Sequence, residues 1–261
     1  MDLPYVIAGL AVGFVVGLTG VGGGSLMTPI LLWFGIHPSA AVGTDLLYAA
    51  ITKSGGVIVH QRAGNIDWRL TGWLALGSIP TTIATLGVIH LWHPDVNTLD
   101  TIMRHMLGVA LLLTSIAILL RNRLLALRRA SQKHLATADD APTQRIVYLT
   151  VAVGGALGVL VTLSSIGAGA LGTLALFLLY PLMPTSRLVG TEIAHAVPLT
   201  LIAGLGHAGQ GHMDWHLLGN LLCGSLPGIW IGSHLTGRLS DHALRPALAG
   251  MLAFAGAKLV F

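Results

Sequence analysis

The stretch Gly20-Val21-Gly22-Gly23-Gly24-Ser25 interrupts an apolar run with glycines, and Gly43-Thr44-Asp45 places a carboxylate inside the next apolar run. Both motifs return 147 residues later, as Gly167-Ala168-Gly169 and Gly190-Thr191-Glu192. Helices broken at matching places in two halves of a chain are typical of binding sites in membrane transporters. We therefore expect the fold to be organised around these two pairs of motifs.

The composition is that of an all-α integral membrane protein embedded in a lipid bilayer. The 261 residues are 54% hydrophobic and 9% charged, with a mean hydropathy of +0.78, whereas a soluble domain carries roughly 25% charge. The basic balance comes from a few clustered arginines, so no nucleic-acid partner is predicted. The single Cys223 excludes a disulfide within one chain and a cysteine metal cluster. Because Met1-Asp2-Leu3-Pro4 lacks positive charge, we expect 3–19 to be a retained helix, not a cleaved signal.

Eight to ten hydrophobic segments are predicted, including short or broken helices near the bilayer midplane. A ten-residue helix reaches about 15 Å, half of a roughly 30 Å hydrocarbon core. The sequence therefore leaves open whether 21–60 and 168–207 are full crossings or re-entrant hairpins. The segments are 3–19, 25–34, 40–60, 68–91, 102–120, 146–163, 169–180, 188–207, 216–237 and 243–260.

The chain divides into an N-terminal transmembrane repeat at 1–121, a basic connecting segment at 122–145 and a C-terminal repeat at 146–261. Comparing 17–80 with 164–227 gives 19 identities in 64 ungapped positions. They include His60/His207 and the dipeptides Asp67-Trp68/Asp214-Trp215, which biased composition does not readily produce in one register. We interpret this match as a duplication.

Lysine and arginine positions predict the orientation of the chain, because these residues concentrate in short cytoplasmic loops. With 122–145 in the cytoplasm, eleven of the fourteen basic residues face inward and both termini lie outside; the exceptions are Lys53, Arg104 and Lys258. The two halves then have opposite orientations, which is the inverted repeat common in secondary transporters. A multi-pass protein of the cytoplasmic (cell inner) membrane is predicted. The sequence leaves a homodimer open.

The glycine stretch offers an anion site, since a turn that leads into a helix exposes backbone N–H groups at the positive end of the helix dipole. Ser25 and Thr28 add hydroxyl groups. The alternative is that the glycines serve close helix packing, as small residues do at membrane helix interfaces.

Three charges fall inside predicted spans: Asp45, Lys53 and Glu192. Such charges are costly in lipid and are expected to face the protein interior or a water-filled path. We expect Lys53 to attract an anion and the two acids to carry a coupling proton; the alternative is that buried partners neutralise them and they direct packing alone. Three histidines are further candidates for proton or ion coupling, with interfacial packing as the alternative: His60, His195 and His207.

The Gly-Val-Gly-Gly-Gly-Ser segment, the following Val-Gly-Thr-Asp and their repetition in the second half resemble the TauE/SafE sulfite exporter family over about 5–260. The resemblance implies export of sulfite, sulfoacetate or a related organosulfonate. Such an anion needs several N–H and O–H donors and one cation. The chain departs from the family pattern where Ala168 replaces a glycine and Glu192 replaces a shorter acid. The predicted substrate-binding residues are Gly22, Gly23, Gly24, Ser25, Thr44, Lys53, Ser165, Gly169 and Thr191.

Two rival functions remain. A divalent metal-ion transporter would use the histidines, of which His207, His212 and His216 cluster in sequence. An intramembrane hydrolase would need the acids as a pair, or a base beside Ser164 or Ser165, and no known catalytic spacing is present. We therefore expect no enzymatic activity, no cofactor and no bound metal, and predict alternating access with proton or ion coupling.

Overall fold

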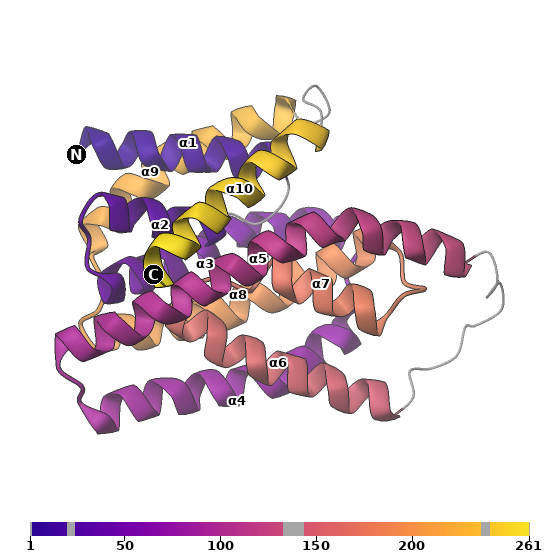
Figure 1. Ribbon diagram of the computed structural model, residues 1–261, viewed down its shortest axis with the longest axis horizontal. Coiled ribbons are helices and arrows are strands. Elements are labelled where there is room, and N and C mark those ends of the chain that lie inside the picture. Colours follow the sequence, from indigo (N-terminus) through magenta and orange to yellow (C-terminus); the bar gives the residue numbers. More distant parts are fainter. Residues whose placement is uncertain (1, 20–23, 133–143, 236–240, 261) are drawn as a thin grey trace.

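The computed structural model describes residues 2–19, 24–132, 144–235 and 241–260. This part of the chain contains ten α-helices and no strand (Figure 1). The helices are α1 (Leu3–Thr19), α2 (Gly24–Trp33), α3 (Pro38–Arg62), α4 (Trp68–Trp92), α5 (Val96–Gln132), α6 (Gln144–Ser164), α7 (Ala170–Leu179), α8 (Thr185–Gly209), α9 (Trp215–Leu235) and α10 (Asp241–Val260).

The hydrophobic segments predicted from the sequence correspond to these helices, except that α5 extends beyond the predicted 102–120 at both ends. It begins at Val96 and continues to Gln132, so the first part of the connecting segment is helical. Its run of leucine, alanine and arginine consists of strong helix formers. The helix therefore continues after the apolar residues end.

The two repeats, α1–α5 and α6–α10, exchange helices. α1 packs along α9, and α6, its counterpart in the second repeat, packs along α4. Figure 1 shows these two pairs on opposite edges of the bundle, with α3 and α8 between them. The α1–α9 contact is close because glycines of α1 meet the backbone of α9, at Gly9, Gly13 and Gly17. Neither repeat can form this packing alone.

The broken helices are half-length. α2 and α7 have ten residues each and reach about 15 Å, too short for a roughly 30 Å core. α3 and α8 have 25 residues each and are long enough to cross. The two ambiguous regions are thus hairpins of one half-helix and one full helix.

Four helices of the described part are long and apolar enough to cross a membrane: α4, α6, α8 and residues Val96–Leu120 of α5. Their large apolar side chains lie exposed, as at Leu76, Ile83 and Ile116. A protein in water would bury such surfaces, whereas hydrocarbon solvates them. The protein is therefore an all-α membrane protein.

Candidate functional site

The centre of the molecule is the contact between α3 and α8, where the two Gly-Thr motifs have equivalent roles. A Cβ at Gly43 would collide with the carbonyl oxygen of His212, and a Cβ at Gly190 would collide with that of Asn65. His212 and Asn65 are themselves related by the 147-residue offset. Each glycine therefore lets the start of one long helix approach the end of the other. This approach places Asp45 and Glu192 in the interior.

Lys53 lies at the middle of this interior. Its side chain is 7% exposed, and its Nζ donates a hydrogen bond to the backbone carbonyl of Ala168, in the turn between α6 and α7. The ammonium interacts electrostatically with both Glu192 and Asp45. The described residues form three ion pairs within 4.0 Å, and Lys53 belongs to none of them. One cation thus stands near two acids without being paired directly to either.

Glu192 points at the beginning of the half-helix α7. It is 1% exposed, and its Oε1 and Cδ lie where a Cβ on Gly172 would be. The carboxylate also faces the backbone N–H of Gly169, the N-cap of α7. Oε1 has no hydrogen-bond partner. A buried carboxylate therefore occupies the positive end of a helix dipole.

Asp45 has a different environment from its counterpart. The hydroxyl of Thr28, in the half-helix α2, donates to Asp45 Oδ2, and Ser165 also faces this carboxylate. Asp45 is fully buried. The residue equivalent to Thr28 in the second repeat is Ala175, which has no hydroxyl. Asp45 thus faces two hydroxyl side chains as well as the backbone of Thr28, whereas Glu192 faces backbone without a hydroxyl.

The turn between α6 and α7 is built by unusual backbone angles. Gly169 has φ +148°, a conformation that side chains rarely adopt. Ser165 has φ +57° and is 3% exposed, and its hydroxyl has no hydrogen-bond partner. The structure therefore brings four predicted site residues to one place: Lys53, Ser165, Gly169 and Glu192, with Asp45 adjoining.

Thr28, which was expected to add a hydroxyl to the glycine-rich anion site, binds Asp45. Ser78 of α4 was not among the predicted site residues and lies 2.8 Å from Nε2 of the buried His195. Tyr48, the counterpart of His195, faces Ser225, the counterpart of Ser78. The identity Gly77-Ser78/Gly224-Ser225 in the repeat was the available signal for these serines.

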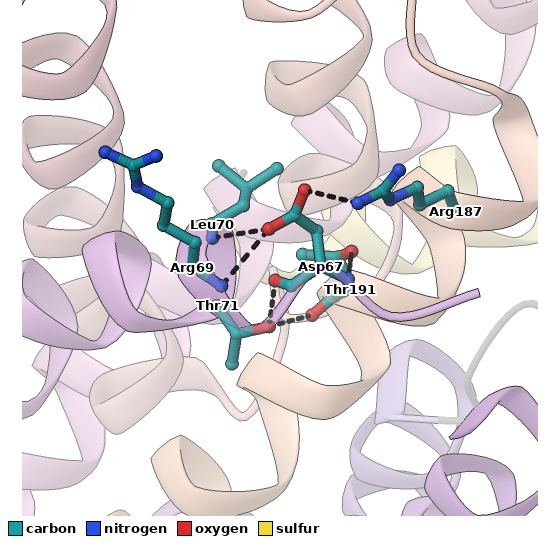
Figure 2. Close-up of polar contacts among 6 residues, drawn as sticks. All are labelled: Asp67, Arg69, Leu70, Thr71, Arg187 and Thr191. Carbon is teal, nitrogen blue, oxygen red and sulfur yellow. Dashed lines mark hydrogen bonds and ion pairs between the residues drawn. The ribbon is translucent and has the colours of Figure 1, made fainter. Parts of the chain in front are cut away.

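The predicted threonines contact the other repeat. Thr191 Oγ1 accepts a hydrogen bond from the backbone N–H of Asp67 at 2.9 Å, and Thr44 Oγ1 accepts one from Asp214 at 3.2 Å. Figure 2 shows that Asp67 also receives the N–H groups of Arg69 and Leu70 and pairs with Arg187. Both threonine hydroxyls thus bind the residue that caps α4 or α9.

The other candidates lie away from Lys53 or outside the described residues. His207 is buried with Nε2 at 2.9 Å from the carbonyl of Thr162, and His60 is half-buried beside Gly190. Gly22 and Gly23 lie outside the described residues, while Gly24 and Ser25 begin α2.

In the loop before α9, burial lowers the pKa of His212. Within the described part, no three His, Cys, Asp or Glu side chains are placed to hold a metal.

Two inverted repeats, each with a half-helix that meets a buried acid of the following long helix, define a membrane protein of the transporter class. Residues 5–259 match the family described as Sulfite exporter TauE/SafE, and the chain belongs to that family.

Its relatives are described in the same terms. It is 41% identical to the "Probable membrane transporter protein YjnA" of Bacillus subtilis over the full length of both chains. It is 28% identical to YdhB, a "Probable membrane transporter protein" of the same organism, over 95% of this chain and 96% of that one. It is also 28% identical to a "Probable membrane transporter protein" of Xylella fastidiosa, over 89% and 84%. No solved structure matches. The protein is a membrane transporter.

Proposed function

We propose that this transporter exports a small sulfur-containing anion, such as sulfite, sulfoacetate or a related organosulfonate, by alternating access. The observation that carries the proposal is the position of Lys53, a buried ammonium at the turn that opens α7. A charge kept inside a membrane protein without a direct ion pair is a functional-site hypothesis by default. The family description supplies the substrate class.

The surroundings of Lys53 suit an oxyanion. The N-terminus of α7 provides backbone N–H groups and the helix dipole, and the buried hydroxyl of Ser165, which faces Asp45, provides a further donor. Sulfite and sulfonate oxygens accept several hydrogen bonds at once. We therefore place the substrate between Lys53 and the start of α7. Thr44 and Thr191 lie at the two ends of the α3–α8 contact, with their hydroxyls engaged across the repeats.

The net charge of the site is our reason for coupling transport of the anion to a proton. Lys53 with two ionised acids gives a net negative site, which repels an anion in a low-dielectric interior. Glu192 already occupies the place at the α7 N-terminus that a substrate oxyanion would take. We infer that Glu192 acts as a tethered competing anion. Protonation of its carboxylate releases the N-terminus and Lys53, so the substrate and a proton bind together.

This coupling also gives a direction of transport. A divalent oxyanion that leaves with one proton carries one net negative charge outward. An inside-negative membrane potential favours that movement by about 2.3 kcal/mol per 100 mV. Asp45, held by Thr28, stays in place and interacts electrostatically with Lys53. His195, which also interacts with Lys53, is tied to Ser78. We assign the coupling proton to Glu192; His60 and His207 are more distant candidates.

We further propose the cytoplasmic membrane as the location, with both termini outside and 122–145 in the cytoplasm. The separation of basic residues between the two ends of the helices supports this orientation. A homodimer is compatible with it. The chain acts as a transporter and not as an enzyme.

Ligand-induced thermal stabilisation of the detergent-purified protein tests the proposal, because a ligand of the folded state raises its apparent stability. Sulfite, sulfoacetate, taurine, thiosulfate and sulfate are compared with zinc and nickel. We expect a shift with one sulfur oxyanion that Lys53→Met abolishes and that Arg69→Gln, at the start of α4, retains. A shift with metals alone, lost in His212→Ala, would instead establish the metal-ion alternative.

A further inference from the structure

A cavity lies at the end of the bundle that is predicted to be external. It has a volume of about 390 Å³. Its walls come from the end of α2, the turn between α2 and α3, the first turns of α5 and the last turns of α10. Figure 1 shows the last turns of α10 crossing α5 at this end, and α10 also contacts α2. The cavity is separate from the Lys53 site.

Two cations line this cavity: Arg104 of α5 and Lys258 of α10. Both side chains are exposed, and neither pairs with an acid among the described residues. The nearby Asp100 accepts the backbone N–H of Ser39 at 3.0 Å and lies 3.2 Å from Nδ1 of His37, which also lines the cavity. The cavity is therefore positively charged and open to an anionic ligand.

These two cations are also exceptions to the rule that lysine and arginine concentrate on the cytoplasmic side. Of the fourteen lysines and arginines, Lys53, Arg104 and Lys258 alone fall outside the predicted cytoplasmic side. Lys53 lies in the substrate site, and the other two share one cavity. Their counterparts at the 147-residue offset, Met251 and Leu111, are apolar, so the duplication did not impose these charges. Basic residues on the translocated side oppose the preferred topology and call for a ligand.

The remaining wall identifies the kind of ligand. It is apolar, with Leu32, Trp33 and Leu259 among its residues. Trp33 is 53% exposed at the end of α2, the place that tryptophan takes at a membrane–water interface. A small oxyanion would be poorly solvated by such a wall. An amphiphile with a phosphate head and acyl chains matches both the cations and the apolar surface.

We propose that this cavity binds the phosphate of an anionic phospholipid, with Arg104 and Lys258 on the headgroup and an acyl chain along Trp33 and Leu32. Basic pockets between membrane helices bind lipid headgroups in this way. Pro29 also lines the cavity, and the preceding residue Thr28 holds Asp45. The bound lipid thus braces α2 against α5 and α10 and steadies the acid of the first repeat.

The test uses the full-length protein, purified and delipidated in detergent, with phosphatidylglycerol as the added lipid. Native mass spectrometry measures bound lipid, and thermal stabilisation measures its affinity. Arg104→Gln with Lys258→Gln is expected to weaken the stabilisation about 30-fold in lipid concentration, since each basic residue contributes to anionic lipid binding. The matched control is Arg62→Gln with Arg69→Gln, which removes two cations from the opposite end and leaves the effect unchanged.

Further comparisons decide between lipid and small anion. Inorganic phosphate and sulfite are added alone at millimolar concentration, and the melting temperature without ligand checks that the variant is folded. Equal lipid binding by the Arg104/Lys258 variant and the wild type would overturn the proposal. Stabilisation by phosphate or sulfite that depends on these two cations, without an effect of lipid, would overturn the lipid assignment and make the cavity an oxyanion site.

Discussion

The two ends of the α3–α8 contact are built from the same motif, yet they are packed differently. At the end of α8, Leu86 of α4 lies where a Cβ on Gly206 would be, and the side-chain amide of Gln210 donates to the Leu86 carbonyl at 3.0 Å. At the end of α3, the counterpart Val59 is 66% exposed. His207 is fully buried, whereas its counterpart His60 is half-buried. We call the end of α8, which α4 covers, the closed end, and the more exposed end of α3 the loose end.

This difference indicates how an inverted repeat can work as a transporter. Because the two repeats share their local motifs, an exchange of the closed and loose arrangements would produce a second state of the same chain. In the predicted orientation, the closed end is external and the loose end is cytoplasmic. The Gly-Thr motifs remain engaged at both ends and are the contacts about which the exchange would occur.

The largest effect on stability is expected from substitution of the glycines in the two Gly-Thr motifs. Gly43→Ala forces a Cβ into the carbonyl of His212 at the closed end, and overpacking of this kind costs about 1–3 kcal/mol or more. Gly190→Ala meets the carbonyl of Asn65 and the ring of His60; because His60 is only half-buried and can move, we expect a smaller loss. Thermal unfolding in detergent measures both.

Gly72→Ala is the control for this pair, because a Cβ there meets nothing within 4 Å. It lies in a helix, where alanine is favoured over glycine, so its melting temperature should stay the same or rise. Equal losses at Gly43 and Gly190 would show that the two ends are equally rigid.

The next effect separates the two acids. If Glu192 is the tethered anion, anion affinity in the wild type falls as pH rises, by at most about tenfold per pH unit for one proton. Glu192→Gln cannot ionise and should bind equally well at low and high pH, whereas Asp45→Asn should keep the pH dependence. Calorimetric titration with the stabilising anion at several pH values between about 5.5 and 8.5 measures this affinity. Loss of the pH dependence in Asp45→Asn, with its retention in Glu192→Gln, would assign the proton to Asp45 instead.

A smaller effect concerns the threonines. Thr191→Val leaves the backbone N–H of Asp67 without its acceptor, and an unsatisfied buried donor costs about 1–3 kcal/mol. Thr44→Val does the same to Asp214, but Asp214 is exposed whereas Asp67 is half-buried, so water can replace the hydroxyl there and the loss should be lower. Chemical unfolding compares the two. A greater loss at Thr44 would show that water does not reach the backbone N–H of Asp214.

The smallest effect is expected at the ion pair between Arg187 and Asp67. Its oxygen–nitrogen distance is 3.0 Å, but the arginine side chain is 47% exposed, and exposed pairs contribute about 0–1 kcal/mol. Arg187→Gln should therefore change stability little, and less in high salt. Asp67→Asn is the stronger test, because Asp67 also caps α4. A large loss in Arg187→Gln would mean that this pair keeps the loose end together.

The sequence by itself determined the class of protein, the repeat and nearly all helix boundaries. Apolar runs of the right length can only be membrane helices, and glycines at matching offsets marked the half-helices, now seen as α2 and α7. It also singled out the interior charges, because Asp45, Lys53 and Glu192 stand out against an apolar background.

Only the tertiary structure decided which groups meet. The pairing of α1 with α9 and of α4 with α6 was not readable, because a membrane helix is apolar on its lipid side and its protein side alike. Nor could spacing along one helix predict that Lys53 would reach the carbonyl of Ala168, or that Thr44 and Thr191 would bind the caps of the other repeat. These contacts join residues more than a hundred positions apart, and they depend on how the two repeats interlock.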